Sequence, residues 1–181
     1  MTRTQITILS ELYVLDAQSG NRQALTQLVE IWTPPLKSRA FQLTRNQDAA
    51  SEVLQESWIA IAKGLRSLRD PSRFGPWALR IVHNKAADWV NEQSRIRAQQ
   101  TNLRTNHEAH ADNEHPERSN QIRTAISTLD PKLREVVFLF YMDHCTIEQL
   151  AQVLNIPVGT AKTRLRKARS LLKPLLERST Q

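Results

Sequence analysis

The sequence predicts an all-α fold of two small helical domains joined by a flexible linker. Only four glycines occur among 181 residues, and no run alternates apolar and polar residues as a strand would. Apolar residues instead recur at helical spacing through two regions. Between these regions, residues 96–118 have almost no large apolar side chain and cannot form a core. We therefore expect domains at 1–95 and 119–181, with 96–118 as the linker.

The first domain is expected to contain helices at 4–18, 22–32, 35–45, 48–66 and 73–95. The fourth of these places a polar face opposite an apolar one, and that polar face consists of Glu52, Gln55 and Glu56. The fifth carries one helical stripe made of Trp77, Ile81, Asn84 and Asp88. Taken alone, each pattern also fits a solvated face or an ordinary core.

The second domain is expected to contain helices at 119–128, 131–142, 146–153 and 158–177. Asp130 and Pro131 form a natural cap and first turn. Thr146 and Gln149 have capping-box spacing. Asn155 can adopt the left-handed conformation that ends a helix, and a proline suited to a first helical turn follows at position 157. The sequence therefore predicts a helix-turn-helix, formed by the last two helices and the tight turn between them.

The last predicted helix has two different faces. Its packing face consists of Ala161, Leu165, Ala168, Leu172 and Leu175. Between Thr160 and Lys173 there is no acidic residue, and six basic residues occur: Lys162, Arg164, Arg166, Lys167, Arg169 and Lys173. A recognition helix needs such a pair of faces, because one must pack while the other meets phosphates and base edges. The alternative is an ordinary amphipathic helix with a solvated basic face.

Charge and cysteine content narrow the class of protein. The chain has 25 basic and 18 acidic residues, and residues 121–181 hold 10 basic against 5 acidic. This excess indicates a polyanionic partner for the second domain. The single cysteine, Cys145, suits a reducing cytosol, and we find no apolar stretch long enough for a membrane helix or a signal peptide. We therefore expect a cytoplasmic protein without direct membrane insertion.

These patterns together resemble the extracytoplasmic-function group of the sigma-70 family, bacterial initiation factors that give RNA polymerase its promoter choice. GNRQALTQLVEIW is similar to the opening helix of that family, and DAASEVLQESW to its polymerase-binding signature. RFGPWALRIVHNKAADW resembles the segment for promoter melting and the downstream (minus-ten) element. LDPKLREVVFLFYMDHCTIEQLAQVLNIPVGTAKTRLRKAR resembles the domain for the upstream (minus-thirty-five) element.

The resemblance implies a role for particular residues. It implies that Glu52, Gln55 and Glu56 dock on the clamp helices of the largest subunit of core RNA polymerase. Contacts with the downstream element as single-stranded DNA are implied for Leu68, Arg69, Ser72, Arg73, Phe74, Trp77, Arg80, Asn84 and Lys85. Contacts with the upstream element as a duplex are implied for Gly159, Thr160, Lys162, Thr163, Arg164, Arg166 and Lys167. It further implies an anti-sigma partner, often anchored in the membrane, and no cofactor.

Two other classes of function compete with this interpretation. A stand-alone helix-turn-helix regulator, with residues 1–95 as a sensing or dimerisation domain, explains the second domain equally well. An enzyme is disfavoured, because the sequence has no phosphate-binding glycine loop, no supported catalytic triad and no metal motif of ordinary spacing. His107, His110 and His115 lie in the linker with nearby acids but without helical register, so we predict no metal site.

Overall fold

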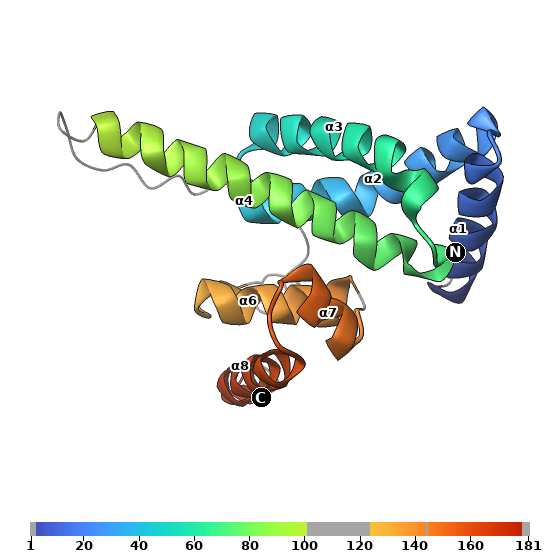
Figure 1. Ribbon diagram of the computed structural model, residues 1–181. Coiled ribbons are helices and arrows are strands. Elements are labelled where there is room, and N and C mark those ends of the chain that lie inside the picture. The colour runs from blue at the N-terminus through green and yellow to red at the C-terminus, as the bar shows by residue number, and fades with distance from the viewer. Residues whose placement is uncertain (1–2, 101–123, 144, 179–181) are drawn as a thin grey trace. The chain divides into compact units, whose positions relative to one another are not determined.

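The structure is a computed structural model that describes residues 3–100, 124–143 and 145–178. The chain forms two compact units, Met1–His110 and Ala111–Gln181. Every regular element in the described ranges is helical, as the sequence predicts (Figure 1). Each unit buries its own set of apolar side chains. None of the helices in these ranges combines the length and the apolar character that crossing a membrane requires.

Over residues 3–100, the described part of the first unit, the chain forms four helices and two short 3₁₀ turns. The helices are α1 (Arg3–Gln18), α2 (Arg22–Thr44), α3 (Gln47–Gly64) and α4 (Phe74–Gln100), and the turns η1 (Leu65–Ser67) and η2 (Pro71–Arg73) connect α3 to α4. Helices α2, α3 and α4 pack on one another, and α1 packs on α2 and on both turns. In Figure 1, α3 and α4 run side by side. The core between the helices includes Leu28, Leu36, Val53, Ile61 and Val82.

The predicted helices 22–32 and 35–45 are in fact one continuous helix, α2, which contains Pro34 and Pro35. A proline inside a helix removes a backbone hydrogen bond and usually kinks or breaks the helix. Packing opposes the break here. Trp32 Nε1 donates to Ser10 Oγ of α1 at 2.9 Å, and Trp58 Nε1 of α3 donates to Thr33 Oγ1 at 3.2 Å. The residues before the prolines are therefore fixed in helical positions by their neighbours.

Two predicted boundaries in the first unit also need correction. The α-helix predicted at 48–66 ends at Gly64, and the chain continues from there as the 3₁₀ turn η1. The predicted helix 73–95 continues to Gln100, so the first five residues of the predicted linker are helical. Amphipathic pattern alone misses this extension, because the last turns of α4 carry mostly polar side chains. The rest of the predicted linker, from residue 101, lies outside the described residues.

The second unit contains the predicted helix-turn-helix. Residues 124–127 are helical, whereas 119–123 of the predicted helix 119–128 lie outside the described residues. Helix α6 (Pro131–Val137) starts after Asp130, whose side chain accepts a 2.9 Å hydrogen bond from the Lys132 amide as predicted. It passes directly into a π-helical segment, η4 (Phe138–Met142). The predicted helix 131–142 is thus helical throughout but changes its hydrogen-bond register near its middle.

The helix-turn-helix itself consists of α7 (Ile147–Val153) and α8 (Val158–Arg178). The predicted capping box is present: Gln149 N donates to Thr146 Oγ1 at 3.2 Å, and Thr146 N donates to Gln149 Oε1 at 2.9 Å. Asn155 has the predicted left-handed conformation, with φ of 51°. These local signals set the length of α7 and the direction in which the chain enters α8.

The packing face of α8 is shorter than predicted. Ala161, Leu165, Ala168 and Leu172 are buried, but Leu175 is 39% exposed. Helix α8 has 21 residues, whereas α6 and α7, on which it packs, have seven each. Leu175 therefore lies outside the buried part of this face, and sequence periodicity cannot reveal where the buried part ends.

Candidate functional site

Helix α3 exposes one polar face. Glu52, Gln55 and Glu56 are all exposed, while Val53, Leu54 and Ile61 on the opposite side are buried. Asn46 fixes the start of this helix, since its side chain accepts a 2.9 Å hydrogen bond from the Ala49 amide. We call Glu52, Gln55 and Glu56 the acidic face. Its two carboxylates and one amide suit a basic, hydrogen-bonding partner.

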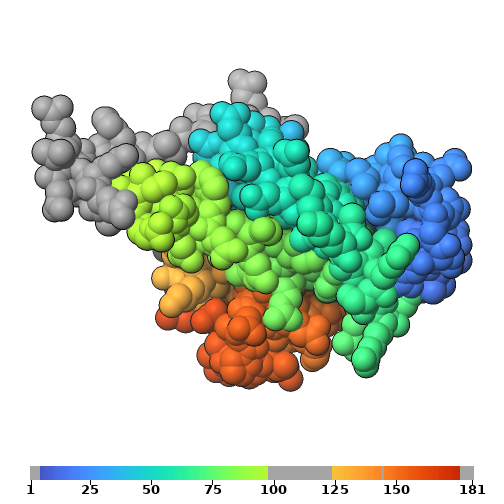
Figure 2. Space-filling view, turned by 45° about the horizontal axis from the view of Figure 1, so that its top comes forward, coloured from blue at the N-terminus to red at the C-terminus, as the bar shows by residue number. Residues whose placement is uncertain are grey.

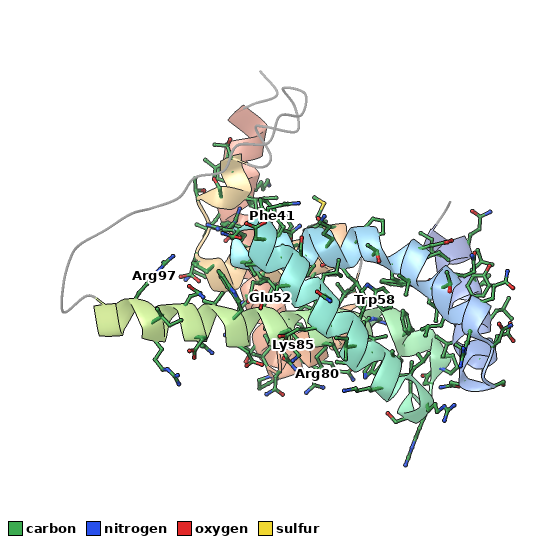
Figure 3. The ribbon with its side chains drawn as sticks, turned by 90° about the horizontal axis from the view of Figure 1, so that it is seen from above. Phe41, Glu52, Trp58, Arg80, Lys85 and Arg97 are labelled. Carbon is green, nitrogen blue, oxygen red and sulfur yellow. The ribbon has the colours of Figure 1, made fainter. Side chains whose placement is uncertain are left out.

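The acidic face is linked to the neighbouring helix by an ion pair. Lys85 Nζ of α4 lies 3.0 Å from Glu56 Oε2, and the two side chains are 38% and 52% exposed. Figure 3 labels Glu52 on α3 and Lys85 on α4, and Figure 2 shows the surfaces of these helices adjoining. Such an exposed pair contributes about 0–1 kcal/mol. The structure thus brings together two residues for which the family resemblance implies separate partners, polymerase for Glu56 and DNA for Lys85.

Residues 65–73, which we call the connecting loop, join α3 to α4. The side chains of Arg69, Ser72 and Arg73 are exposed and that of Leu68 is half-buried. All of these were predicted DNA contacts. The loop presents them next to the start of α4, so three polar or basic side chains and one apolar side chain share a short exposed segment.

Asp70 organises the end of the connecting loop, and sequence reasoning missed it. Its Oδ1 accepts hydrogen bonds from Ser72 N at 3.1 Å and Ser72 Oγ at 2.6 Å, and its Oδ2 lies 3.0 Å from Arg73 Nε. Hydrogen bonds from Ser72, together with the charge of Arg73, lower the pKa of Asp70. The signal was available, because an aspartate followed by a proline also starts α6 at Asp130.

Gln18, at the end of α1, holds the other end of the connecting loop. Its Nε2 donates to the backbone oxygen of Leu65 at 2.9 Å and to that of Leu68 at 2.8 Å. Nothing in the sequence pattern predicts this contact, because it joins residues 47 and 50 positions apart.

The predicted site residues of α4 fall into two groups. Phe74 is fully buried; it packs edge-on against Trp32, with 5.6 Å between ring centroids, and lies 6.0 Å from Trp77. It was predicted to contact DNA, but its side chain has no exposed surface and instead anchors the start of α4. The other members of the set are at least partly accessible: Trp77 and Lys85 are half-buried, and Arg80 and Asn84 are exposed.

Two glycines let these rings pack closely. A Cβ on Gly75 would overlap the Trp32 ring, and a Cβ on Gly64 would lie 3.0 Å from Trp77 Cζ2. Gly75 is therefore required by close approach, and a side chain at Gly64 would press on the Trp77 ring; neither glycine was singled out from the sequence. Trp77 is held against the end of α3 by this contact.

In the second unit, most of the predicted DNA contacts lie on the exposed side of α8, and Arg164 borders its packing face. Five of them are exposed and two are half-buried. The exposed residues are Gly159, Lys162, Thr163, Arg166 and Lys167, and the half-buried ones are Thr160 and Arg164. The Thr163 hydroxyl donates to the Gly159 carbonyl within the helix at 2.9 Å. The result is a largely exposed basic and hydroxyl-bearing face without an acidic residue.

Arg169 of the same helix has a structural partner. Its Nε donates to the Tyr141 hydroxyl at 2.8 Å, and its guanidinium lies 5.0 Å from the Phe140 ring centroid. This hydrogen bond and cation–π contact tie α8 to the π-helical segment. Arg169 thus helps to stabilise the second unit. The linker histidines 107, 110 and 115 lie outside the described residues.

Two helical units, one presenting a helix-turn-helix, define a DNA-binding protein, and comparison with known proteins places it more closely. The family model described as "Sigma-70 region 2" matches residues 28–96, and that described as "Sigma-70, region 4" matches residues 119–172. Together they cover more than half of the chain. Over 176 residues the chain is 26% identical to the ECF RNA polymerase sigma factor SigW of Bacillus subtilis, covering 90% of this chain and 94% of that protein.

Two further likenesses agree with this. The ECF RNA polymerase sigma-E factor of Salmonella typhimurium is 26% identical over 188 residues, covering 94% of this chain and 98% of its own length. The sigma factor RpoE from Bartonella quintana, solved in complex with the anti-sigma factor NepR, has the same fold. Its TM-score is 0.68 at 20% identity, with 84% of this chain and 96% of that chain covered. The chain belongs to the extracytoplasmic-function group of the sigma-70 family of RNA polymerase sigma factors.

Proposed function

We propose that this sigma factor docks on core RNA polymerase through the acidic face, reads the downstream promoter element as melted single strand, and reads the upstream element as duplex. In this proposal residues 1–95 carry the first two tasks and residues 119–181 carry the third. The observation that carries it is the exposed acidic face of α3. A stand-alone DNA-binding regulator leaves this face without an assigned partner, whereas docking on a basic protein surface would use it.

For docking, we propose that Glu52, Gln55 and Glu56 engage the clamp helices of the largest polymerase subunit. The three side chains lie on one side of a capped, well-packed helix, so they are held in a fixed spacing before binding. Preorganisation of this kind reduces the entropy that binding must overcome.

For the downstream element, we propose that the connecting loop and the exposed side of α4 accept single-stranded DNA. An unstacked base needs an apolar or aromatic surface and nearby hydrogen-bonding groups. Leu68 and Trp77 offer the first, and Asn84 and Ser72 the second. Basic side chains for the backbone are Arg69, Arg73, Arg80 and Lys85. Phe74 contributes by holding the start of α4.

For the upstream element, we propose that α8 enters the major groove. Its exposed face combines donors that recognise guanine edges or phosphates with threonine hydroxyls. In this proposal Gly159 and Thr160, at the start of the helix, contact the DNA backbone. Arg164, Arg166, Lys162 and Lys167 supply the charge.

We further infer that an anti-sigma factor antagonises this sigma factor in the cytoplasm. We also infer that the sigma factor itself catalyses no reaction. The complex between a similarly folded sigma factor and its anti-sigma factor supports the first inference. The exposed acidic face and the exposed basic face of α8 are surfaces that such a partner would cover to prevent initiation.

The decisive experiment measures binding to core RNA polymerase. E52K reverses a charge on the acidic face and leaves the Glu56–Lys85 ion pair intact. E56K also reverses a charge, and in addition it places the new lysine next to Lys85. We expect each to weaken polymerase binding at least about tenfold, since close charge pairs at interfaces are worth 1.5 kcal/mol or more. The matched control is E30K on α2, where Glu30 is exposed and accepts a hydrogen bond from Gln27.

A second measurement separates the proposal from the stand-alone regulator. The purified chain alone should bind promoter duplex weakly, and addition of core polymerase should give specific open complexes. Tight sequence-specific binding by the free chain, with E52K and E56K unchanged in polymerase association, would favour the regulator instead.

A further inference from the structure

Helix α1 precedes both matched family segments, which begin at residues 28 and 119, yet it touches the connecting loop. Its last residue, Gln18, makes hydrogen bonds to the first part of this loop. A primary amide has two N–H donors, and the Gln18 nitrogen uses them on two backbone carbonyls, those of Leu65 and Leu68. These carbonyls lie at the two ends of η1, whose turn is closed by a 3.1 Å bond from Leu68 N to Leu65 O.

We propose that Gln18 is a positioning residue for downstream-element reading: it fixes the connecting loop in the conformation that presents Leu68 and Arg69 to single-stranded DNA. This inference rests on the proposed function and extends it to a helix outside both family matches. Gln18 itself need not touch DNA.

The arrangement of the loop supports this role. At Leu68 the chain leaves η1 in an extended conformation, with φ of −72° and ψ of 103°. Asp70 fixes the chain again two residues later through Ser72 and Arg73. Leu68 and Arg69 therefore lie between two anchored points, and Gln18 supplies the first. Ordering a short loop before binding removes an entropy cost that the complex would otherwise bear.

A purely structural role for Gln18 predicts something different. Loss of the amide would then lower stability without altering which DNA the protein prefers. Ser10, also on α1, provides the matched control: its hydroxyl accepts the 2.9 Å hydrogen bond from Trp32 and donates to the Ile6 carbonyl of its own helix. S10A therefore loosens α1 from α2 while leaving both Gln18 bonds in place.

The experiment compares wild type, Q18L, Q18E and S10A as full chains assembled with core RNA polymerase. Q18L removes both donors, and Q18E turns a carboxylate toward two carbonyl oxygens at nearly unchanged size. The probes are a fluorescent single-stranded oligonucleotide of the downstream element, a scrambled version, and an upstream-element duplex. All come from a promoter identified by transcription of a genomic library. Hydrogen exchange of the amides at 65–73 and thermal unfolding are measured in parallel.

We expect Q18L and Q18E to bind the downstream oligonucleotide about thirtyfold more weakly, which corresponds to two lost hydrogen bonds of typical strength. They should also discriminate less against the scrambled strand, exchange faster at 65–73, and bind the upstream duplex as wild type does. S10A should keep the wild-type discrimination. If Q18L does not fold, Q18N replaces it, because its amide is one methylene too short to reach both carbonyls.

Two results would overturn this inference and leave the proposed function standing. One is that Q18L and Q18E distinguish the downstream strand from the scrambled strand as well as wild type does. The other is that S10A loses this discrimination to the same extent as the Gln18 variants. If wild-type holoenzyme itself does not distinguish the two single strands, the proposed downstream reading is wrong and the inference falls with it.

Discussion

Gly75 is glycine because a tryptophan ring occupies the space where any side chain would begin. The ring belongs to Trp32, which also packs against Phe74 and donates a hydrogen bond to Ser10. A single residue without a side chain thus allows α1, α2 and α4 to meet at one aromatic cluster. That cluster positions the start of α4 and hence the end of the connecting loop.

We expect G75A to lower the free energy of unfolding of the first unit by about 1–3 kcal/mol, the usual cost of overpacking a core. The matched control is G159A at the start of α8, where an added Cβ meets nothing within 4 Å. That change should be neutral or stabilising by up to about 1 kcal/mol, because alanine favours helix over glycine. Chemical denaturation of both variants tests this; equal stabilities for G75A and wild type would contradict it.

The carboxyl of Asp70 provides a second prediction at this scale. Its pKa is lowered mainly by hydrogen bonding from Ser72. A group with a lowered folded-state pKa stabilises the fold above its ordinary pKa, and this contribution is lost as the pH falls through the folded value. We expect S72A to raise the pKa of Asp70 toward its ordinary value. The measurement is an NMR titration of the carboxyl carbon.

S67A is the control for that titration, since the Ser67 hydroxyl donates to the Gly64 carbonyl instead. It should leave the pKa of Asp70 where it is in wild type. An Asp70 titration identical in S72A and wild type would show that the bond from the Ser72 hydroxyl does not lower the pKa of Asp70.

At the scale of elements, the sequence predicted helices well where local signals agreed. The cap at Asp130, the capping box at Thr146 and the left-handed turn at Asn155 all occur, because each depends on residues within four positions of one another. The break at Pro34 and Pro35 was wrong, because contacts of Trp32 and Thr33 with other helices outweigh a local preference. The acidic face and the basic face followed from periodicity; Asp70, Gln18 and Gly75 act through partners that periodicity does not identify.

Helix α8 allows an electrostatic test of its proposed groove contact. K162A should weaken binding of the holoenzyme to upstream duplex, and the slope of log K against log salt should become less negative by about 0.9 for one lost phosphate contact. K37A on α2 also removes one exposed lysine and should leave the slope unchanged. Identical slopes for K162A and wild type would exclude a phosphate contact by Lys162.

At the scale of the whole molecule, the chain consists of two units that each bury their own core. We expect two separable unfolding transitions in calorimetry. G75A should lower the midpoint temperature of the first unit's transition only. L150A should lower that of the second unit's transition only, because Leu150 of α7 is fully buried and its truncation reduces the free energy of unfolding by about 2–5 kcal/mol. A single cooperative transition shifted by both variants would contradict the independence of the units.

The aromatic cluster has a practical consequence for such measurements. All four tryptophans, at positions 32, 58, 77 and 89, belong to the first unit. Excitation selective for indole therefore reports on that unit alone, without any attached dye. Trp77, beside the connecting loop, should give an emission change when single-stranded DNA arrives, while the half of the protein that carries α8 stays optically silent.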